Sequence, residues 1–345
     1  MERPHLAGLV EDRWNHLLGG ALRSRGWGHL VVPLVGYGGP DFVRVLARVV
    51  LAPVPDASRA DRPVADERYR RGWRNFATAE AIDVEVTVTV AGVRHPTRTD
   101  RSGHVDVRLP GSGLAPGWQE VTVQAEDAAP SLARVFVVAG DEEFGLVSDI
   151  DDTVIATLLP RPLIAAYNTF VVQEQTRRPV DGMATLYAGL LAEHPGAPTV
   201  YVSTGAWNAA GTLARFLARH GFPAGPLLLT DWGPTNTGWF RSGQEHKHAC
   251  LESLVRDFPR IRWVLVGDDG QHDPVIYADF AREHPDRVRA IAIRELTATQ
   301  QVLAHGTPVE RADAEAGADT AVPGVPSVRS PDGVGLAGEL AAHGL

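Results

Sequence analysis

The 345-residue chain shows none of the sequence patterns that are typical of disulfide frameworks, secretory leaders or membrane-spanning helices. Its one cysteine, Cys250, excludes an internal disulfide and a cysteine zinc cluster. No apolar run approaches the roughly 20 residues that a membrane-spanning helix needs. The N-terminus lacks the basic start and apolar core of a secretory leader. We therefore expect a cytoplasmic protein without a transmembrane segment.

Lysine is equally scarce, since Lys247 is the only one and every other basic side chain among the 33 lysines and arginines is an arginine. A compact ammonium fits a small polar site that a planar guanidinium does not fit. In a composition so strongly biased toward arginine, this one lysine indicates a functional position.

Basic residues are also outnumbered, because the chain carries a net charge of −9. The acidic excess lies after residue 140, which argues against nucleic acid as the main partner. With 44% hydrophobic residues, the chain is long and apolar enough for two domains of ordinary size.

The first 140 residues predict an antiparallel β domain behind a short helical segment. Within 1–30, Trp14, Leu17 and Leu18 have helical spacing. Alternating apolar and polar residues then recur between Gly, Pro and Asp turns, which predicts a β-sandwich of immunoglobulin-like or transthyretin-like type over 31–140. No catalytic cluster lies there, so we interpret it as a packing or adaptor module.

The pattern changes after residue 140 to alternating strands and helices. Such alternation predicts an α/β domain over 141–310, with a Rossmann-like parallel sheet and helices on both faces. Residues 154–198, between its first two strands, are predicted to form a small helical cap. The tail, 311–345, is rich in Ala, Gly, Pro and Asp, and we expect it to be disordered apart from a short terminal helix.

An acidic cluster directly follows the first predicted strand of this domain. Asp149, Asp151 and Asp152 are too close together to remain charged beside apolar surface without a cation. The carboxyl end of a strand is where open α/β sheets bind ligands, and Mg²⁺ is the hard ion that prefers carboxylate oxygens. An EF-hand is excluded, because Val154 and Pro160 stand where its loop needs Gly and Glu.

Other polar side chains follow later strands or begin helices. Taken singly, each has an ordinary alternative: Ser203 as the cap of a strand end, Asp268 as part of a turn, and Asp273, before a proline, as a helix N-cap. Taken together, they are the types that phosphoryl transfer needs: a nucleophile, a proton carrier, and donors and cations for the phosphoryl oxygens. The full set is Ser203, Thr204, Lys247, Asp268, Asp269 and Asp273.

These motifs, in this order, resemble the haloacid dehalogenase superfamily of aspartate-nucleophile phosphatases. SDIDDTV, VSTGAWN, the HK pair and LVGDDGQHDPVIY are more narrowly similar to the catalytic domain of actin-patch-type phosphatidate phosphatases and their bacterial relatives. The resemblance covers roughly 140–305, and the preceding β domain fits the bacterial layout. One departure is that Ser203–Trp207 reads STGAW, where the family often has Ser-x-Ser-Pro-Trp.

The resemblance implies a Mg²⁺-dependent phosphatase with an aspartyl-phosphate intermediate. Asp149 is implied to be the nucleophile and a metal ligand. Asp151 is implied to be the general acid and base, with its backbone carbonyl on the metal. The remaining implied roles are phosphoryl or substrate binding by Ser203 and Thr204, stabilisation of the aspartyl-phosphate by Lys247, metal binding by Asp268, and support from Thr153, Asp269 and Asp273, the last orienting Lys247 or a metal-bound water.

Three functions remain open from the sequence. The first is hydrolysis of phosphatidate or a related lipid phosphate, which the protein would reach peripherally at a membrane. The second is the same chemistry on a soluble phosphomonoester, and the third is a non-catalytic binding protein that uses the β-sandwich. In the cap, Arg177 and Arg178 are predicted to hold an anionic head group; their simpler interpretation is a solvated helical face.

Overall fold

The computed structural model divides into two compact units, Met1–Ala139 and Gly140–Leu345. It describes residues 22, 24, 26–53, 79–111, 113–156, 178–230, 239–270, 272–297, 300 and 320–345. None of the helices in these ranges is both long and apolar enough to cross a membrane.

The first unit contains one continuous, mostly antiparallel sheet with the strand order β1-β3-β2-β9-β8-β5-β6. Strands β4 and β7 also pair with β3, and only β2 and β9 run parallel among the described pairs. The strands are β1 (Trp27–Pro33), β2 (Gly36–Gly39), β3 (Phe42–Pro53), β4 (Ala79–Glu80), β5 (Glu85–Val90), β6 (Val93–Arg98), β7 (His104–Pro110), β8 (Gly117–Ala125) and β9 (Ser131–Val137).

Valine alternation explains how this sheet forms a core. In β5, Val86, Val88 and Val90 are buried, whereas the intervening threonines are partly exposed, as a period of two requires. Val43, Val45 and Val49 of β3 join the buried valines of β5, β8 and β9 in one hydrophobic cluster. The antiparallel β unit is thus observed, and its assignment to an immunoglobulin-like or transthyretin-like sandwich stays a prediction.

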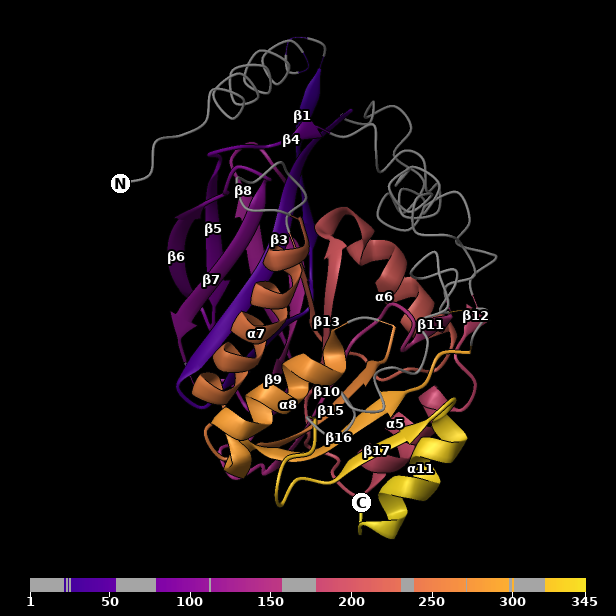
Figure 1. Ribbon diagram of the computed structural model, residues 1–345. Helices are drawn as coiled ribbons and strands as arrows, with labels where there is room; N and C mark the ends of the chain where they lie inside the picture. Colours follow the sequence, from indigo (N-terminus) through magenta and orange to yellow (C-terminus); the bar gives the residue numbers. More distant parts are fainter. Residues whose placement is uncertain are drawn as a thin grey trace. The chain divides into compact units, whose positions relative to one another are not determined.

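The second unit is a six-stranded parallel sheet with the order β14-β13-β10-β15-β16-β17 (Figure 1). This confirms the predicted α/β class with a parallel sheet. The strands are β10 (Phe144–Ser148), β13 (Thr199–Ala206), β14 (Leu227–Thr230), β15 (Arg262–Asp268), β16 (Val288–Arg294) and β17 (Ser327–Ser330), and β11 (Ile155–Ala156) pairs with β12 (Arg178–Pro179) beside them.

Helices cover both faces of the parallel sheet. Along the sheet, the connection from β10 to β13 runs toward the β14 edge, and the connection from β15 to β16 runs toward the β17 edge. Because both connections are expected to be right-handed, their helices lie on opposite faces of the sheet. Helix α11 packs against α5, and α7 packs against α8 (Figure 1). The helices are α5 (Met183–Ala192), α6 (Ala210–Arg219), α7 (Trp239–Asp257), α8 (Asp273–Glu283) and α11 (Gly333–Ala342), with short 3-10 turns η3 (Trp207–Ala209) and η4 (Pro285–Arg287).

Strand β10 lies at the point where the strand order reverses. Its neighbours are β13 on one side and β15 on the other, and all five of its residues are buried. In open α/β sheets, the crevice beyond the carboxyl ends of the strands at such a point receives the ligand. The sheet therefore delivers the residue after β10, Asp149, to this crevice.

Within the tail predicted over 311–345, helix α11 confirms the short terminal helix, whereas the ordered strand before it corrects the expected disorder. Strand β17 pairs with β16, and Leu336 and Leu340 of α11 are fully buried. The glycine content reflects close packing: a Cβ on Gly333 would lie 2.3 Å from the backbone of Gly182. This segment has few apolar residues, but they lie in the core. The composition therefore indicated disorder wrongly. Residues 311–319 lie outside the described ranges.

Two other boundaries also change. Of the cap predicted over 154–198, residues 157–177 lie outside the described ranges. Helix α5, in the second half, buries Met183 and Tyr187 in the core, so it forms part of the layer that covers the sheet. Of the helical segment predicted over 1–30, residues 27–30 belong to β1, and residues 1–21 are not described.

Candidate active site

A short backbone turn presents the acidic cluster at the end of β10. The Asp149 amide donates to the carbonyl of Val266 on β15 at 2.9 Å. The amides of Val154 and Ile155 both donate to the carbonyl of Ile150, at 2.9 and 3.0 Å. Asp152 adopts a φ of 62°, a left-handed conformation that aspartate tolerates better than most residues. These bonds fix the direction in which Asp149 leaves the sheet.

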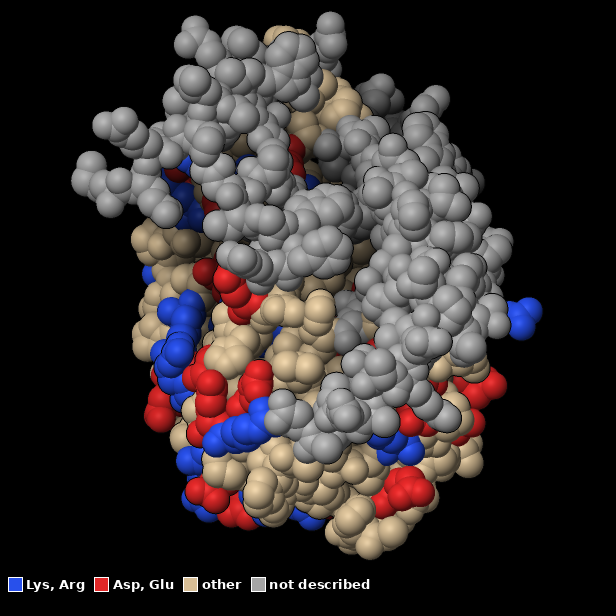
Figure 2. Space-filling model, in the orientation of Figure 1, with Lys and Arg blue, Asp and Glu red and all other residues tan. Residues whose placement is uncertain are grey.

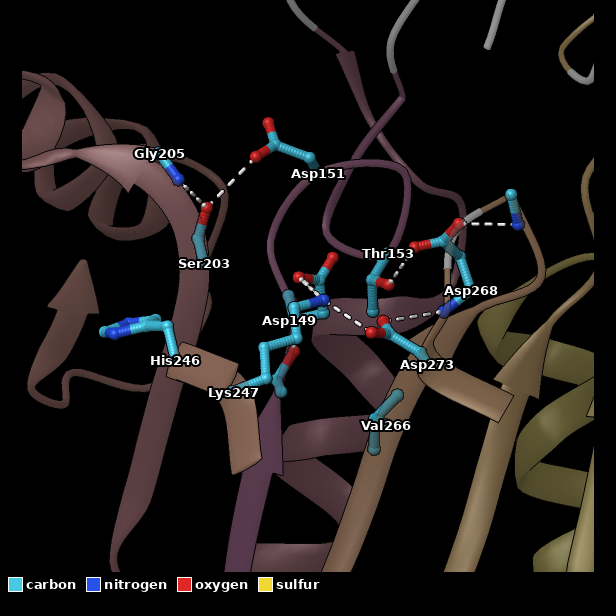
Figure 3. A network of polar contacts seen from close by, with 12 residues as sticks. Asp149, Asp151, Thr153, Ser203, Gly205, His246, Lys247, Val266, Asp268 and Asp273 are labelled. Atoms are coloured by element: carbon cyan, nitrogen blue, oxygen red, sulfur yellow. Dashed lines mark hydrogen bonds and ion pairs between the residues drawn. The ribbon is translucent and has the colours of Figure 1, made fainter. Parts of the chain in front are cut away.

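Lys247 of α7 lies between two buried carboxylates (Figure 3). Its Nζ is 2.7 Å from Oδ1 of Asp149 and 2.5 Å from Oδ1 of Asp273. Burial by itself lowers the pKa of Lys247, but Asp149, Asp273 and Asp268 together raise it above its ordinary value. The only lysine of the chain is therefore a permanent buried cation that joins Asp149 to the start of α8.

Asp268 completes a group of three carboxylates. Oxygens of Asp149, Asp268 and Asp273 lie within 4.8 Å of one another, and all three residues are buried. The Oδ1 atom of Asp268 accepts from the Gly270 amide at 2.7 Å. Gly267 permits this crowding, because a Cβ there would lie 2.5 Å from Oδ2 of Asp273.

This group has the donor set that a divalent cation needs. Three carboxylates face one ammonium, and Oδ2 of Asp149 is buried without a hydrogen-bond partner among the described residues. Burial, then the charges of Asp273 and Asp151, raise the pKa of Asp149 from 3.8 to about 8, against the opposing effect of Lys247. Burial also raises the pKa of Asp268 well above its ordinary value. A hard cation such as Mg²⁺ would offset this excess of negative charge, so the residues fit the metal that the motifs imply.

A second polar pair, Ser203 on β13 and Asp151 after β10, lies beside the carboxylates. Ser203 donates from Oγ to Oδ2 of Asp151 at 3.1 Å and accepts from the Gly205 amide at 2.9 Å (Figure 3). Neighbouring Thr204 is held through its carbonyl, which accepts from Thr230 Oγ1 at 2.8 Å. The structure thus brings a hydroxyl and a partly exposed carboxylate together beside the buried carboxylate group.

The supporting residues predicted from the motifs connect neighbouring loops. Thr153 Oγ1 donates to Oδ2 of Asp268 at 3.5 Å, which links the β10 turn to the end of β15. Asp269 accepts from the Leu296 amide at 2.7 Å, and its own amide donates to the carbonyl of Arg294 at 3.0 Å. Both residues therefore stabilise the loops that carry the carboxylates.

Arg177 and Arg178 have different outcomes. Arg177 lies outside the described ranges. Arg178 lies on β12 rather than on the predicted helix, opposite Ala156 of β11 and with its side chain exposed. Arg178 is thus paired with Ala156, at the end of the segment 149–156 that contains the Asp149 turn.

Sequence reasoning missed two groups that hold the site. Arg294, at the end of β16, is buried and donates from Nη1 to the Asp152 carbonyl at 2.6 Å and from Nε to the Pro331 carbonyl at 3.1 Å. Ser148 donates to the Asp149 carbonyl at 2.6 Å and, having one proton, accepts from Tyr187 of α5. The position of Arg294 at a strand end was a readable signal, whereas nothing in the sequence connects Tyr187 with the site.

Comparisons with known proteins agree with this arrangement. Residues 144–295 match the family model described as phosphatidate phosphatase APP1, catalytic domain. That span runs from the first residue of β10 to the residue after β16. It therefore contains all the carboxylates, Ser203 and Lys247.

The chain is 28% identical over 151 residues to phosphatidate phosphatase APP1 of Saccharomyces cerevisiae, and 26% identical over 153 residues to an uncharacterized protein of Schizosaccharomyces pombe. Each match covers 44% of this chain and 25% of the relative. Among solved structures, the HAD domain of the effector protein Lem4 from Legionella pneumophila is 14% identical to this chain. The match covers 52% of this chain and 94% of that domain, and its TM-score of 0.31 is too low to show a common fold. The family match agrees with the resemblance that the motifs indicated: over residues 144–295 the chain is similar to the catalytic domain of phosphatidate phosphatase APP1.

Proposed function

We propose that the second unit is a Mg²⁺-dependent phosphatase that hydrolyses a phosphomonoester, phosphatidate or a related lipid phosphate, through an aspartyl-phosphate at Asp149. The observation that carries this proposal is the buried chain from Asp149 through Lys247 to Asp273, with Asp268 beside it. The phosphatidate specificity is taken from the name of the yeast relative. A purely binding role would leave this costly group of buried carboxylates without a purpose.

The chemistry follows from the positions of the side chains. Asp149 attacks phosphorus with one carboxylate oxygen, while Lys247 holds Oδ1 and thereby sets the orientation of the carboxylate. Asp151 protonates the leaving oxygen and then accepts a proton from the water that hydrolyses the intermediate. Ser203 would exchange its bond to Asp151 for one to a phosphoryl oxygen.

Asp149, Asp268 and the carbonyl of Asp151 would hold the Mg²⁺ ion. The ion would supply charge neutralisation between the anionic nucleophile and the anionic phosphate. Asp273 is engaged by Lys247 and by the Asp268 amide, so we assign it to orienting the lysine.

The substrate class can be tested with phosphatidate in detergent micelles against a panel of soluble phosphomonoesters, all with Mg²⁺. We expect kcat/KM to be highest for phosphatidate and to depend on its surface concentration in the micelle. A soluble ester with the highest kcat/KM would favour the second function, for which the STGAW departure at Ser203–Trp207 is the supporting observation.

The predicted partners and location are part of this proposal. Over the described part of the face in Figure 2, acidic and basic side chains are interspersed, an arrangement unlike the basic surface that nucleic acid requires. A cytoplasmic location, with peripheral binding when the substrate is a membrane lipid, remains our prediction.

Changing both Arg177 and Arg178 to Ala is expected to raise KM for the best substrate about tenfold, with a smaller fall in kcat. A charge-assisted hydrogen bond to a head group stabilises the bound substrate, so its loss raises KM by about tenfold. Arg260→Ala, at an exposed ion pair with Glu143, is the matched control and should leave KM unchanged. An unchanged KM in the double variant would mean that both arginines belong to the solvated surface.

Without divalent cations, stability is expected to fall as the pH rises from about 4 to about 8. The folded-state pKa of Asp149, about 8, exceeds its value of 3.8 when exposed. The folded state therefore binds the extra proton across this window and loses that advantage as the proton leaves. We expect the melting temperature of Asp149→Asn to exceed that of the wild type by about 5 °C at pH 8 and to match it near pH 4. Saturating Mg²⁺ should remove the difference at pH 8, whereas parallel pH curves for the two proteins would contradict the shift.

A further inference from the structure

A second cluster of metal-binding side chains lies on α7 and α8, away from the carboxylates of the active site. Nε2 of His248 is 3.1 Å from Oε2 of Glu283, and Nε2 of His284 is 2.6 Å from Oε1 of Glu252. Ligand atoms of His248, Glu252 and Glu283 all lie within 4.8 Å of one another. The two helices thus place one imidazole and two carboxylates at one spot, and His284, the residue after α8, is joined to them through Glu252.

The backbone and a buried ring set the positions of these groups. His248 and Glu252 are four residues apart on α7, so they project from the same face. The ring of Phe280, fully buried on α8, contacts both imidazoles, with centroids 6.2 Å from His248 and 4.9 Å from His284. The amide of His284 also donates to the Phe280 carbonyl at 2.8 Å. Both imidazoles are therefore oriented before any ligand arrives.

We propose that His248, Glu252, Glu283 and His284 bind one divalent transition-metal ion, with Zn²⁺ as the best fit. Two imidazole nitrogens and two carboxylate oxygens are a donor set that tetrahedral Zn²⁺ accepts. Bonds of about 2.0–2.1 Å to the ion place neighbouring ligand atoms roughly 3.3 Å apart. Ligand atoms of His248, Glu252 and Glu283 already lie within 4.8 Å of one another, and His284 would join them from its contact with Glu252. With neutral imidazoles, the two glutamates supply the charge that balances the ion.

The site is open to solvent and separate from the active site. The side chain of His248 is 39% exposed and that of Glu283 is 56% exposed, so an ion can enter without unfolding. Glu283 lies ten residues after Asp273 on α8, which is about 15 Å along a helix. The ion would connect α7, which carries Lys247, to the far end of the helix that begins at Asp273. It acts as a structural clamp between the two helices.

The test uses the full chain with saturating Mg²⁺ and Co²⁺ as a spectroscopic probe for the Zn²⁺ site. Asp268→Asn serves as the background, because it removes a carboxylate from the active-site group. We expect one equivalent of Co²⁺ to bind with the strong visible absorption of a tetrahedral site, and Zn²⁺ to displace it. Adding His248→Gln and His284→Gln should weaken binding at least tenfold, whereas His343→Gln, at the exposed end of α11, should not.

Stability supplies an independent readout. Zn²⁺ should raise the melting temperature of the Asp268→Asn protein and leave that of the double histidine variant unchanged. Glu252→Gln combined with Glu283→Gln gives the same test if the histidine variant does not fold. No saturable Co²⁺ binding, or binding that both double variants retain, would reduce the cluster to two histidine–glutamate ion pairs and overturn the proposal.

Discussion

Asp149→Asn is expected to lower phosphatase turnover by at least about a thousandfold and to prevent any phosphoenzyme from forming. An amide cannot attack phosphorus, and no other described side chain takes the place of Asp149 at the end of β10 beside Lys247. Losing a covalent nucleophile has effects of this size or larger. Rapid quenching after mixing with an aryl phosphate, followed by intact-mass analysis, would report the covalent adduct.

Asp151→Asn should fail differently, because it keeps the nucleophile and loses the proton carrier. Loss of a general acid and base costs about 10²–10⁴ in rate. An aryl phosphate has a leaving group that needs no proton, so it should still phosphorylate Asp149, and the intermediate should accumulate as a mass increase of about 80 Da, the mass of one phosphoryl group. On an alkyl phosphate, the same variant should show neither turnover nor accumulation.

The neighbouring Asp152→Asn is the matched control for both variants. It removes a carboxylate from the same turn, and asparagine tolerates the positive φ found there. We expect it to keep most of the activity. An adduct on Asp149→Asn, or turnover at the wild-type rate, would show that Asp149 is not the nucleophile.

Removal of divalent cations is expected to abolish turnover completely. Asp149 and the phosphate are both anions, and the buried site already has an excess of carboxylates over its one ammonium. EDTA should therefore stop the reaction, and added Mg²⁺ should restore it. Mg²⁺ should also stabilise the folded protein, by about 2.7 kcal/mol at a hundred times its dissociation constant, which thermal unfolding would measure without reference to activity.

Asp268→Asn should weaken both effects of Mg²⁺, whereas Asp269→Asn should weaken them much less. Asp268 is buried in the carboxylate group, but Asp269 accepts from the Leu296 amide and supports the loop. Full activity in excess EDTA, or equal Mg²⁺ dependence in the two variants, would contradict a metal site at Asp268.

The parallel sheet and the residues that gather at the candidate site were readable because their signals are local. Alternating strands and helices require a parallel sheet with both faces covered, and β10 is buried throughout as that pattern demands. The carboxyl ends of parallel strands meet at one edge, so Asp149, Asp268 and Asp273 had to lie near one another. The scarcity of lysine identified Lys247 before any contact was known.

The misjudged segments are those whose structure depends on distant partners. Leu336 and Leu340 are buried because β17 extends the sheet and α11 packs on α5, and composition contains no record of either contact. The glycine content of the tail was interpreted as a sign of disorder, although Gly333 permits the close approach to Gly182. Helix α5 was assigned to a cap for the same reason, since its covering role appears only when the sheet is assembled.

The sequence by itself therefore determined the α/β class of the second unit and the side chains at its strand ends, because period and motif order are properties of neighbouring residues. Only the tertiary structure decided how these side chains are held. The hydrogen bonds from Arg294 to the Asp152 turn and to Pro331, and from Tyr187 to Ser148, join segments far apart in the chain. Such bonds depend on distances of about 3 Å between folded elements, which no local pattern specifies.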